Sequence, residues 1–240
     1  MINRELQKRI LSSIILIPIA LFFIFQGPVF FAFFISIFFL TSSYEWVKMN
    51  KKDSFKVLGL VYLLLICYLT YLFRQNFFFQ FILVLIVCIF TDLGGYIFGK
   101  IFKGPKLTKI SPKKTYAGLI GSFILSIIAA LIYIKYINLG QAAYLEIQYL
   151  LLENDLENFN LYFLIIILFI SLISQIGDLI ISYFKRSAKV KDTGNLLPGH
   201  GGLLDRVDGI IFAIPASYIL FDYLKNEKKN CNTRLNWIHW

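Results

Sequence analysis

The chain has 240 residues, of which 58% are hydrophobic and only 16% are charged, and its mean hydropathy is +0.70. A water-facing surface needs about a quarter of its residues charged, so this composition excludes an ordinary soluble domain, a disordered chain and a coiled coil. Long stretches without Asp, Glu, Lys or Arg recur along the chain, and a membrane-spanning helix needs about 17–25 such residues. The composition therefore predicts an all-α, polytopic bundle of membrane helices.

Seven membrane-spanning helices are expected in chain order. The first uncharged stretch, 10–44, is too long for one helix, and Gly27-Pro28 at its middle favours a turn, so we divide the stretch there. The expected helices are 10–26, 28–47, 57–73, 77–98, 116–136, 160–184 and 203–224.

The net charge of +10 is unevenly distributed along the chain. With the N-terminus inside, most Lys and Arg fall on the inner side, and an acidic loop around Glu153 and Glu157 falls outside, as the positive-inside rule requires. We therefore expect a membrane surface and no nucleic acid as the partner of the basic residues. The basic tail does not fit, because seven crossings place it outside.

Asp92 and Asp178 lie inside expected helices, where an ionisable group costs about 2.5–3.5 kcal/mol and so indicates function. Asp92 follows an apolar run and begins a glycine-rich segment, although a helix end at the membrane surface would also explain it. Asp178 shares one helix face with Gln175, Ser182 and Lys185. The alternative for Asp178 is an internal Asp–Lys pair that only steadies the bundle.

A dense cluster of charges and glycines occupies 185–208. Asp205 and Asp208 are three residues apart, so on a helix they can share a hard cation. Magnesium binds carboxylate oxygens and keeps positions for substrate phosphates, and backbone N–H groups at glycines can cradle phosphate oxygens. The cluster therefore predicts a phosphoryl-group site, in which His200 is expected to form structural hydrogen bonds rather than act as a base.

A block of hydroxyl and ammonium groups, Ser111-Pro112-Lys113-Lys114-Thr115, is expected on the same side of the membrane. These groups suit a polyphosphate, although lysines beside a membrane also bind anionic lipid. The chain has no G-x-x-x-x-G-K-[ST] motif, so a P-loop is excluded as the nucleotide cradle.

These residues resemble the phosphatidate cytidylyltransferases, also called CDP-diacylglycerol synthases. The run Ser182–Asp208 matches the signature of that family without a gap or a wrong residue, and 92–96, 111–115 and 177–179 also match in order. The resemblance covers 92–208. One departure is Ile181, where many members carry a glutamate.

The resemblance implies that a cytidylyl group is transferred from CTP to phosphatidate in a magnesium-dependent reaction, with a monovalent cation such as potassium nearby. The implied metal ligands are Asp178, Asp205 and Asp208, which we also expect to be catalytic together with Lys185 and Arg206. The expected substrate-binding residues are Asp92, Ser111, Lys113, Lys114, Thr115, Ser182, Arg186, Lys191, Asp192, Gly199, His200, Gly201 and Gly202.

The expected partners are therefore CTP, phosphatidate and membrane lipid, and a homodimer is also considered. We expect the inner (cytoplasmic) membrane, crossed several times, with the site facing the cytoplasm where CTP is found. We treat 1–240 as one membrane-embedded domain, divided into N-terminal helices 1–91, a catalytic region 92–208, a last helix 209–224 and a tail 225–240. Two alternatives remain: a CTP-dependent polyprenol or lipid kinase, and an ion-coupled transporter.

Overall fold

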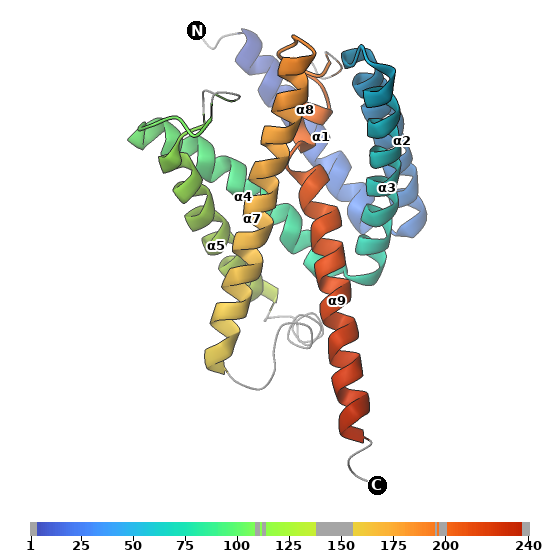
Figure 1. The fold of residues 1–240 in the computed structure, drawn as a ribbon, viewed down its shortest axis with the longest axis vertical. Helices are drawn as coiled ribbons and strands as arrows, with labels where there is room; N and C mark the ends of the chain where they lie inside the picture. The colour runs from blue at the N-terminus through green and yellow to red at the C-terminus, as the bar shows by residue number, and fades with distance from the viewer. Residues whose placement is uncertain are drawn as a thin grey trace. The chain divides into compact units, whose positions relative to one another are not determined.

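A computed structural model describes residues 4–108, 111, 114–137, 156–194, 196 and 201–236. The regular structure of these residues is helical, apart from one isolated bridge between Lys106 and Thr115. The helices are α1 (Arg4–Phe25), α2 (Pro28–Met49), α3 (Asp53–Asn76), α4 (Phe78–Phe102), α5 (Tyr116–Ile137), α7 (Leu156–Ser187), α8 (Leu204–Val207) and α9 (Ile210–Asn236). Figure 1 shows their arrangement along the chain.

The expected all-α membrane architecture is confirmed, because five of these helices are long and apolar enough to cross a membrane. They are α2, α3, α4, most of α5 and the stretch Leu161–Ser187 of α7, while α1 contributes a shorter apolar stretch, Ile14–Phe25. Seven crossings remain a prediction. The single expected helix 203–224 is wrong, because α8 ends at Val207 and α9 begins only at Ile210.

The described chain divides into two compact units, one formed by 1–75 with 178–208, the other by 76–177 with 209–240. The charged segment 178–208 therefore packs with the N-terminal helices, from which it is far in sequence. Of the three boundaries, one lies at the end of α3, one lies inside α7, and one lies at the break between α8 and α9. Whether the chain behaves as one domain stays a prediction.

In the first unit, a turn at Gly27 separates α1 from α2, as the sequence predicted. Gly27 has a φ of 124°, which a residue with a side chain rarely adopts, and Pro28 opens α2. Arg74 of α3 donates from Nε and Nη2 to the carbonyl of Ile24 at 3.2 and 2.9 Å, and its guanidinium lies 5.5 Å from the centre of the Phe31 ring. A buried arginine thus satisfies a carbonyl in the last turn of α1 and joins three helices.

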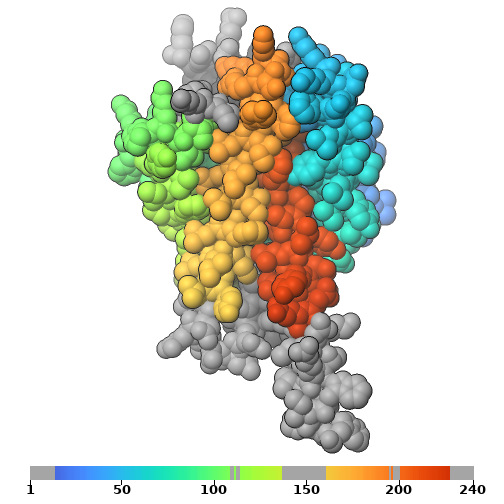
Figure 2. Space-filling view, in the orientation of Figure 1, coloured from blue at the N-terminus to red at the C-terminus, as the bar shows by residue number. Residues whose placement is uncertain are grey.

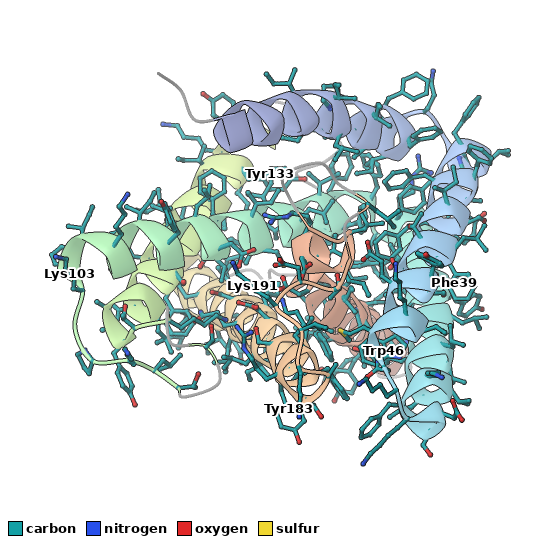
Figure 3. All side chains as sticks on the ribbon, turned by 90° about the horizontal axis from the view of Figure 1, so that it is seen from above. Phe39, Trp46, Lys103, Tyr133, Tyr183 and Lys191 are labelled. Atoms are coloured by element: carbon teal, nitrogen blue, oxygen red, sulfur yellow. The ribbon has the colours of Figure 1, made fainter. Side chains whose placement is uncertain are left out.

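An aromatic cluster joins α2 and α3 to the end of α7 within the same unit. Trp46 donates from its indole nitrogen to the Phe55 carbonyl at 2.8 Å, and Gly59 of α3 lets the indole lie directly against the helix backbone. The ring of Phe184 packs against Trp46 and Phe55 with centroid distances of 5.0 and 5.7 Å. Neighbouring Tyr183 points outward (Figure 3). This cluster positions the charged end of α7.

In the second unit, α4 and α5 pack through small residues. A Cβ at Gly94 would lie 2.5 Å from the Gly121 carbonyl oxygen, so the two backbones approach as closely as small residues allow. The Ser122 hydroxyl donates to the Thr91 carbonyl, and the Thr91 hydroxyl donates to Ser171 of α7, both at 2.8 Å. Figure 2 shows α7 and α9 side by side on the visible face, and Gly209 indeed lies against Ser174.

Candidate active site

The second half of α7 carries the polar face that the sequence predicted. The Ser182 hydroxyl donates to Asp178 Oδ1 at 3.3 Å, and Lys185 Nζ forms an ion pair with Asp205 Oδ1 at 2.9 Å. The Lys185 and Asp205 side chains are only 11% and 6% exposed. The partner of Lys185 in this pair thus comes from the start of α8, 20 residues further along the chain.

Both carboxylate oxygens of Asp205 are engaged by donors of the protein. While Oδ1 receives the Lys185 ammonium, Oδ2 accepts hydrogen bonds from the Thr193 backbone N–H at 2.8 Å, the Gly202 N–H at 3.0 Å and the Thr193 hydroxyl at 3.1 Å. Hydrogen bonds to a charged acceptor are the strong ones in proteins. Asp205 therefore organises the turn around it, a role that the sequence did not predict.

Glu45 of α2 holds the same turn from the other side, and sequence reasoning missed it. The residue is 1% exposed. Its Oε1 accepts the Leu203 N–H at 2.8 Å, and its Oε2 accepts the Leu204 N–H at 2.9 Å and the Thr193 hydroxyl at 3.2 Å. Glu45 lies inside the expected span 28–47, so the rule that singled out Asp92 and Asp178 would also have found it.

Asp178 and Asp208, the other two predicted metal ligands, are half-buried at the ends of the charged segment. Gly209 packs against Ser174, and a Cβ at Gly209 would lie 2.9 Å from the Ser174 carbonyl oxygen. Ser174 precedes Asp178 by one turn of α7, and Gly209 follows Asp208 directly in the chain.

A magnesium ion fits this donor set only together with substrate. The described residues contain no group of three His, Cys, Asp or Glu side chains that could enclose a metal. Magnesium, however, commonly binds one or two carboxylates and completes its shell with phosphates and water. Of the three predicted ligands, Asp205 has one oxygen, Oδ1, that already faces an ammonium group. Metal binding by all three remains a prediction.

Three residues of the Ser111–Thr115 block, Ser111, Lys114 and Thr115, are described, and they precede α5. The Leu107 N–H donates to the Lys114 carbonyl at 2.8 Å, and the Thr115 hydroxyl accepts the Gly118 N–H at 3.1 Å, which caps α5. Lys114 Nζ reaches the carbonyl of Gln175 at 3.1 Å, three residues before Asp178 on α7. The block is therefore brought to the stretch of α7 that leads into the charged segment.

The remaining predicted residues differ in their exposure. Ser182 and Gly202 are buried, and Ser111 and Gly201 are half-buried. The exposed ones are Asp92, Arg186, Lys191, Asp192 and Arg206. Lys191 is on the segment that follows α7 (Figure 3). Lys113, Gly199 and His200 lie outside the described residues.

Comparison with known proteins reaches beyond the segment that carried the resemblance. The sequence model of the cytidylyltransferase family matches residues 7–79 and 57–224. A phosphatidate cytidylyltransferase of Rickettsia bellii is 34% identical over 222 residues, which cover 90% of this chain and 90% of that protein. The chain belongs to the cytidylyltransferase family. The enzyme of the same name from Rickettsia typhi is 42% identical over 147 residues, covering 60% of this chain and 59% of that protein.

Family membership extends the resemblance towards the N-terminus. The sequence suggested that only 92–208 carried it, whereas the match to the cytidylyltransferase family begins at residue 7 and includes α2 with Glu45. Ile181, the position at which the sequence departs from the resemblance, is 5% exposed. This chain therefore has an apolar, buried side chain at that position.

Proposed function

We propose that this chain transfers the cytidylyl group of CTP to phosphatidate, giving CDP-diacylglycerol and pyrophosphate for phospholipid biosynthesis. The observation that carries the proposal is the match along nine-tenths of both chains to a protein named phosphatidate cytidylyltransferase. The fold supports it, because five helices are long and apolar enough to cross a membrane and the proposed lipid substrate lies in a membrane.

The reaction exchanges one phosphoanhydride bond for another. An oxygen of the phosphatidate phosphate attacks the α-phosphorus of CTP, the bond between the α-phosphorus and its bridging oxygen to the β-phosphate breaks, and pyrophosphate leaves with that electron pair. The attacking oxygen is already anionic near neutral pH, so no strong base is required. The main obstacle is repulsion between two polyanions, which the site must offset with positive charge.

The exposed cations of the charged segment suit this task. Arg186, Lys191 and Arg206 are exposed, while Lys185 is held in its ion pair. We assign these three cations to the phosphates of CTP and phosphatidate, and Lys189 is a fourth exposed cation of the described segment. Lys114 lies against the Gln175 carbonyl and supplies a further positive group beside the same helix.

In this proposal Asp178 and Asp208 bind a magnesium ion, which supplies positive charge at the transferring phosphate when CTP is present. A nearby monovalent cation and a homodimer remain predictions, and the roles assigned to the described residues do not depend on either. The chain is placed in the inner membrane with the charged segment facing the cytoplasm, because CTP is cytosolic and phosphatidate lies in the leaflet.

The direct test uses the purified chain in liposomes that contain phosphatidate, with CTP labelled at the α-phosphate, with and without Mg²⁺. We expect the label to enter the lipid only when Mg²⁺ is present. Asp53→Asn is the matched control, because Asp53 is 90% exposed and outside the charged segment. It should keep the rate of the unchanged protein.

Repeating the experiment with CTP labelled at the γ-phosphate separates the alternatives. A lipid kinase would transfer only the γ-label of CTP, and a transporter would leave both labels in the nucleotide. Either outcome would refute cytidylyl transfer.

A further inference from the structure

Glu45 is the buried acid that the proposed chemistry leaves unused. It is 1% exposed, and the described residues that donate to it all come from the segment that follows α7. The closest of them in sequence, Thr193, is 148 residues away. A buried carboxylate is costly unless its oxygens are hydrogen-bonded, and here three donors satisfy them. The buried Glu45 carboxylate is therefore held by hydrogen bonds from one segment that is distant in sequence.

The carboxylates of Glu45 and Asp205 both accept hydrogen bonds from the segment that follows α7. Glu45 accepts the N–H groups of Leu203 and Leu204, and Asp205 accepts those of Thr193 and Gly202. The Thr193 hydroxyl joins the two acids, at 3.2 Å from Glu45 Oε2 and 3.1 Å from Asp205 Oδ2. We call these two carboxylates and the Thr193 hydroxyl the loop clamp.

The glycine of the signature that precedes Leu203 makes room for the clamp. A Cβ at Gly202 would lie 2.6 Å from Glu45 Oε2 and would overlap the Thr193 hydroxyl. At Gly194 an added Cβ would lie 2.9 Å from Glu45 Oε1. Both residues thus pack directly on the Glu45 carboxylate. This close approach is independent of the hydrogen bonds and points to the same residue.

The clamp fixes both ends of a segment that carries substrate-binding groups. Thr193 follows Lys191 and Asp192, and Leu204 precedes Asp205 and Arg206. Holding Thr193 and Leu204 on one carboxylate therefore fixes the spacing between two pairs of charged residues. The exposed cations of these pairs, Lys191 and Arg206, are those that we assign to substrate phosphates.

We propose that Glu45 is a positioning residue of the cytidylyltransferase reaction: its carboxylate holds the loop so that Lys191 and Arg206 meet the phosphates in a fixed geometry. The inference rests on the proposed function, because it assigns the clamp a task in that reaction. A misplacement of about 1 Å in a positioning element can cost about 100-fold in rate.

The first test replaces Glu45 by Gln, which keeps the shape but turns one acceptor into a donor facing the loop. Per folded molecule, we expect kcat/KM for CTP to fall at least about tenfold, which corresponds to the loss of one charged hydrogen bond. Thr193→Val should cause a similar fall, and the double variant should be no worse than the more damaged single one, because both changes open the same clamp.

Ser42→Ala is the matched control. Ser42 lies three residues before Glu45 on α2, is 0% exposed, and has a hydroxyl with no hydrogen-bond partner among the described residues. It should keep the kcat/KM of the unchanged protein. A purely structural role for Glu45 predicts instead a lower melting temperature with unchanged kcat/KM per folded molecule, and that result would overturn the proposal.

A second readout does not depend on activity. Leu196 is 48% exposed, and a spin label on Leu196→Cys, in a Cys231→Ser background with Cys67 and Cys88 buried, reports loop mobility. We expect the label to become more mobile with Glu45→Gln and to stay unchanged with Ser42→Ala. Equal mobility in both variants would refute the clamp. If the unchanged protein forms no CDP-diacylglycerol, the proposed function is refuted instead, whatever the mobility of the spin label.

Discussion

Replacing Asp205 by Asn tests how the charged segment is held together. The carboxylate accepts the Lys185 ammonium at one oxygen and three loop donors at the other. Asn keeps the shape but has only one acceptor oxygen. If that oxygen serves Thr193 and Gly202, the amide N–H₂ faces the Lys185 ammonium, and donor meets donor.

The expected loss is large because the ion pair is buried. Removing one partner of a buried pair costs about 3–5 kcal/mol, since the remaining charge is left without compensation. The Lys185 side chain is 11% exposed, so water can offset only part of this, and we expect the lower end of the range. For a chain of this size, about 3 kcal/mol corresponds to a melting temperature lowered by roughly 6–12 °C.

The assay is thermal unfolding of the purified protein in detergent, followed by tryptophan fluorescence. Asp53→Asn is the control, because Asp53 forms a 2.7 Å pair with Lys56 but is 90% exposed, and it should not shift the transition. The double variant Lys185→Met with Asp205→Asn should recover part of the lost stability without recovering activity. If Asp205→Asn melts at or above the temperature of the unchanged protein, Asp205 does not hold the segment, and its predicted metal role becomes the better explanation.

Three further changes test other parts of the chain. Asp178→Asn should remove most α-label transfer in liposomes while the protein stays folded and inserted, because a magnesium ligand is lost; a normal rate would exclude that role. Gly202→Ala should reduce transfer of the α-label at least about tenfold, because the new Cβ overlaps the Thr193 hydroxyl. A normal rate would show that the loop can shift to accommodate the Cβ without loss of activity. Arg74→Met should lower the free energy of unfolding by about 1.5–3 kcal/mol, because the Ile24 carbonyl loses a charged donor. The transfer rate per folded molecule should not change. Denaturation in detergent measures the free energy of unfolding, and an unchanged value would argue against this contact.

Features set by neighbouring residues could be predicted from the sequence. The Gly27-Pro28 turn and the helices that follow it depend on apolar length and on backbone preferences that a short window contains. The polar face of α7 follows from helical spacing alone, and the hydrogen bond from Ser182 to Asp178 has that spacing. Identification of the family rested likewise on an ordered, local run of residues.

Features that depend on distant pairing could not be predicted in this way. The break between Val207 and Ile210 interrupts a stretch that looked like one helix, and the Gly209–Ser174 contact that accompanies it joins residues far apart in sequence. Glu45 meets Leu204 across 159 positions. Its presence in an apolar helix marked it as unusual, but only the fold shows which donors it serves.

The ion pair of Lys185 also bears on which cations can meet the phosphates, and the catalytic role predicted for Lys185 stays a prediction. If Lys185 turned to a phosphate, the Asp205 oxygen that it leaves would be a buried anion beside an incoming anion, and both effects oppose the movement. The sequence counted Lys185 with the other cations because it has no means to distinguish a paired ammonium from an exposed one. With Lys185 neutralising Asp205, we propose that exposed Arg186, Lys191 and Arg206, together with Lys114, supply the positive charge that meets the substrate. Replacing exposed Lys191 should therefore weaken CTP binding without the loss of stability that we expect at Asp205.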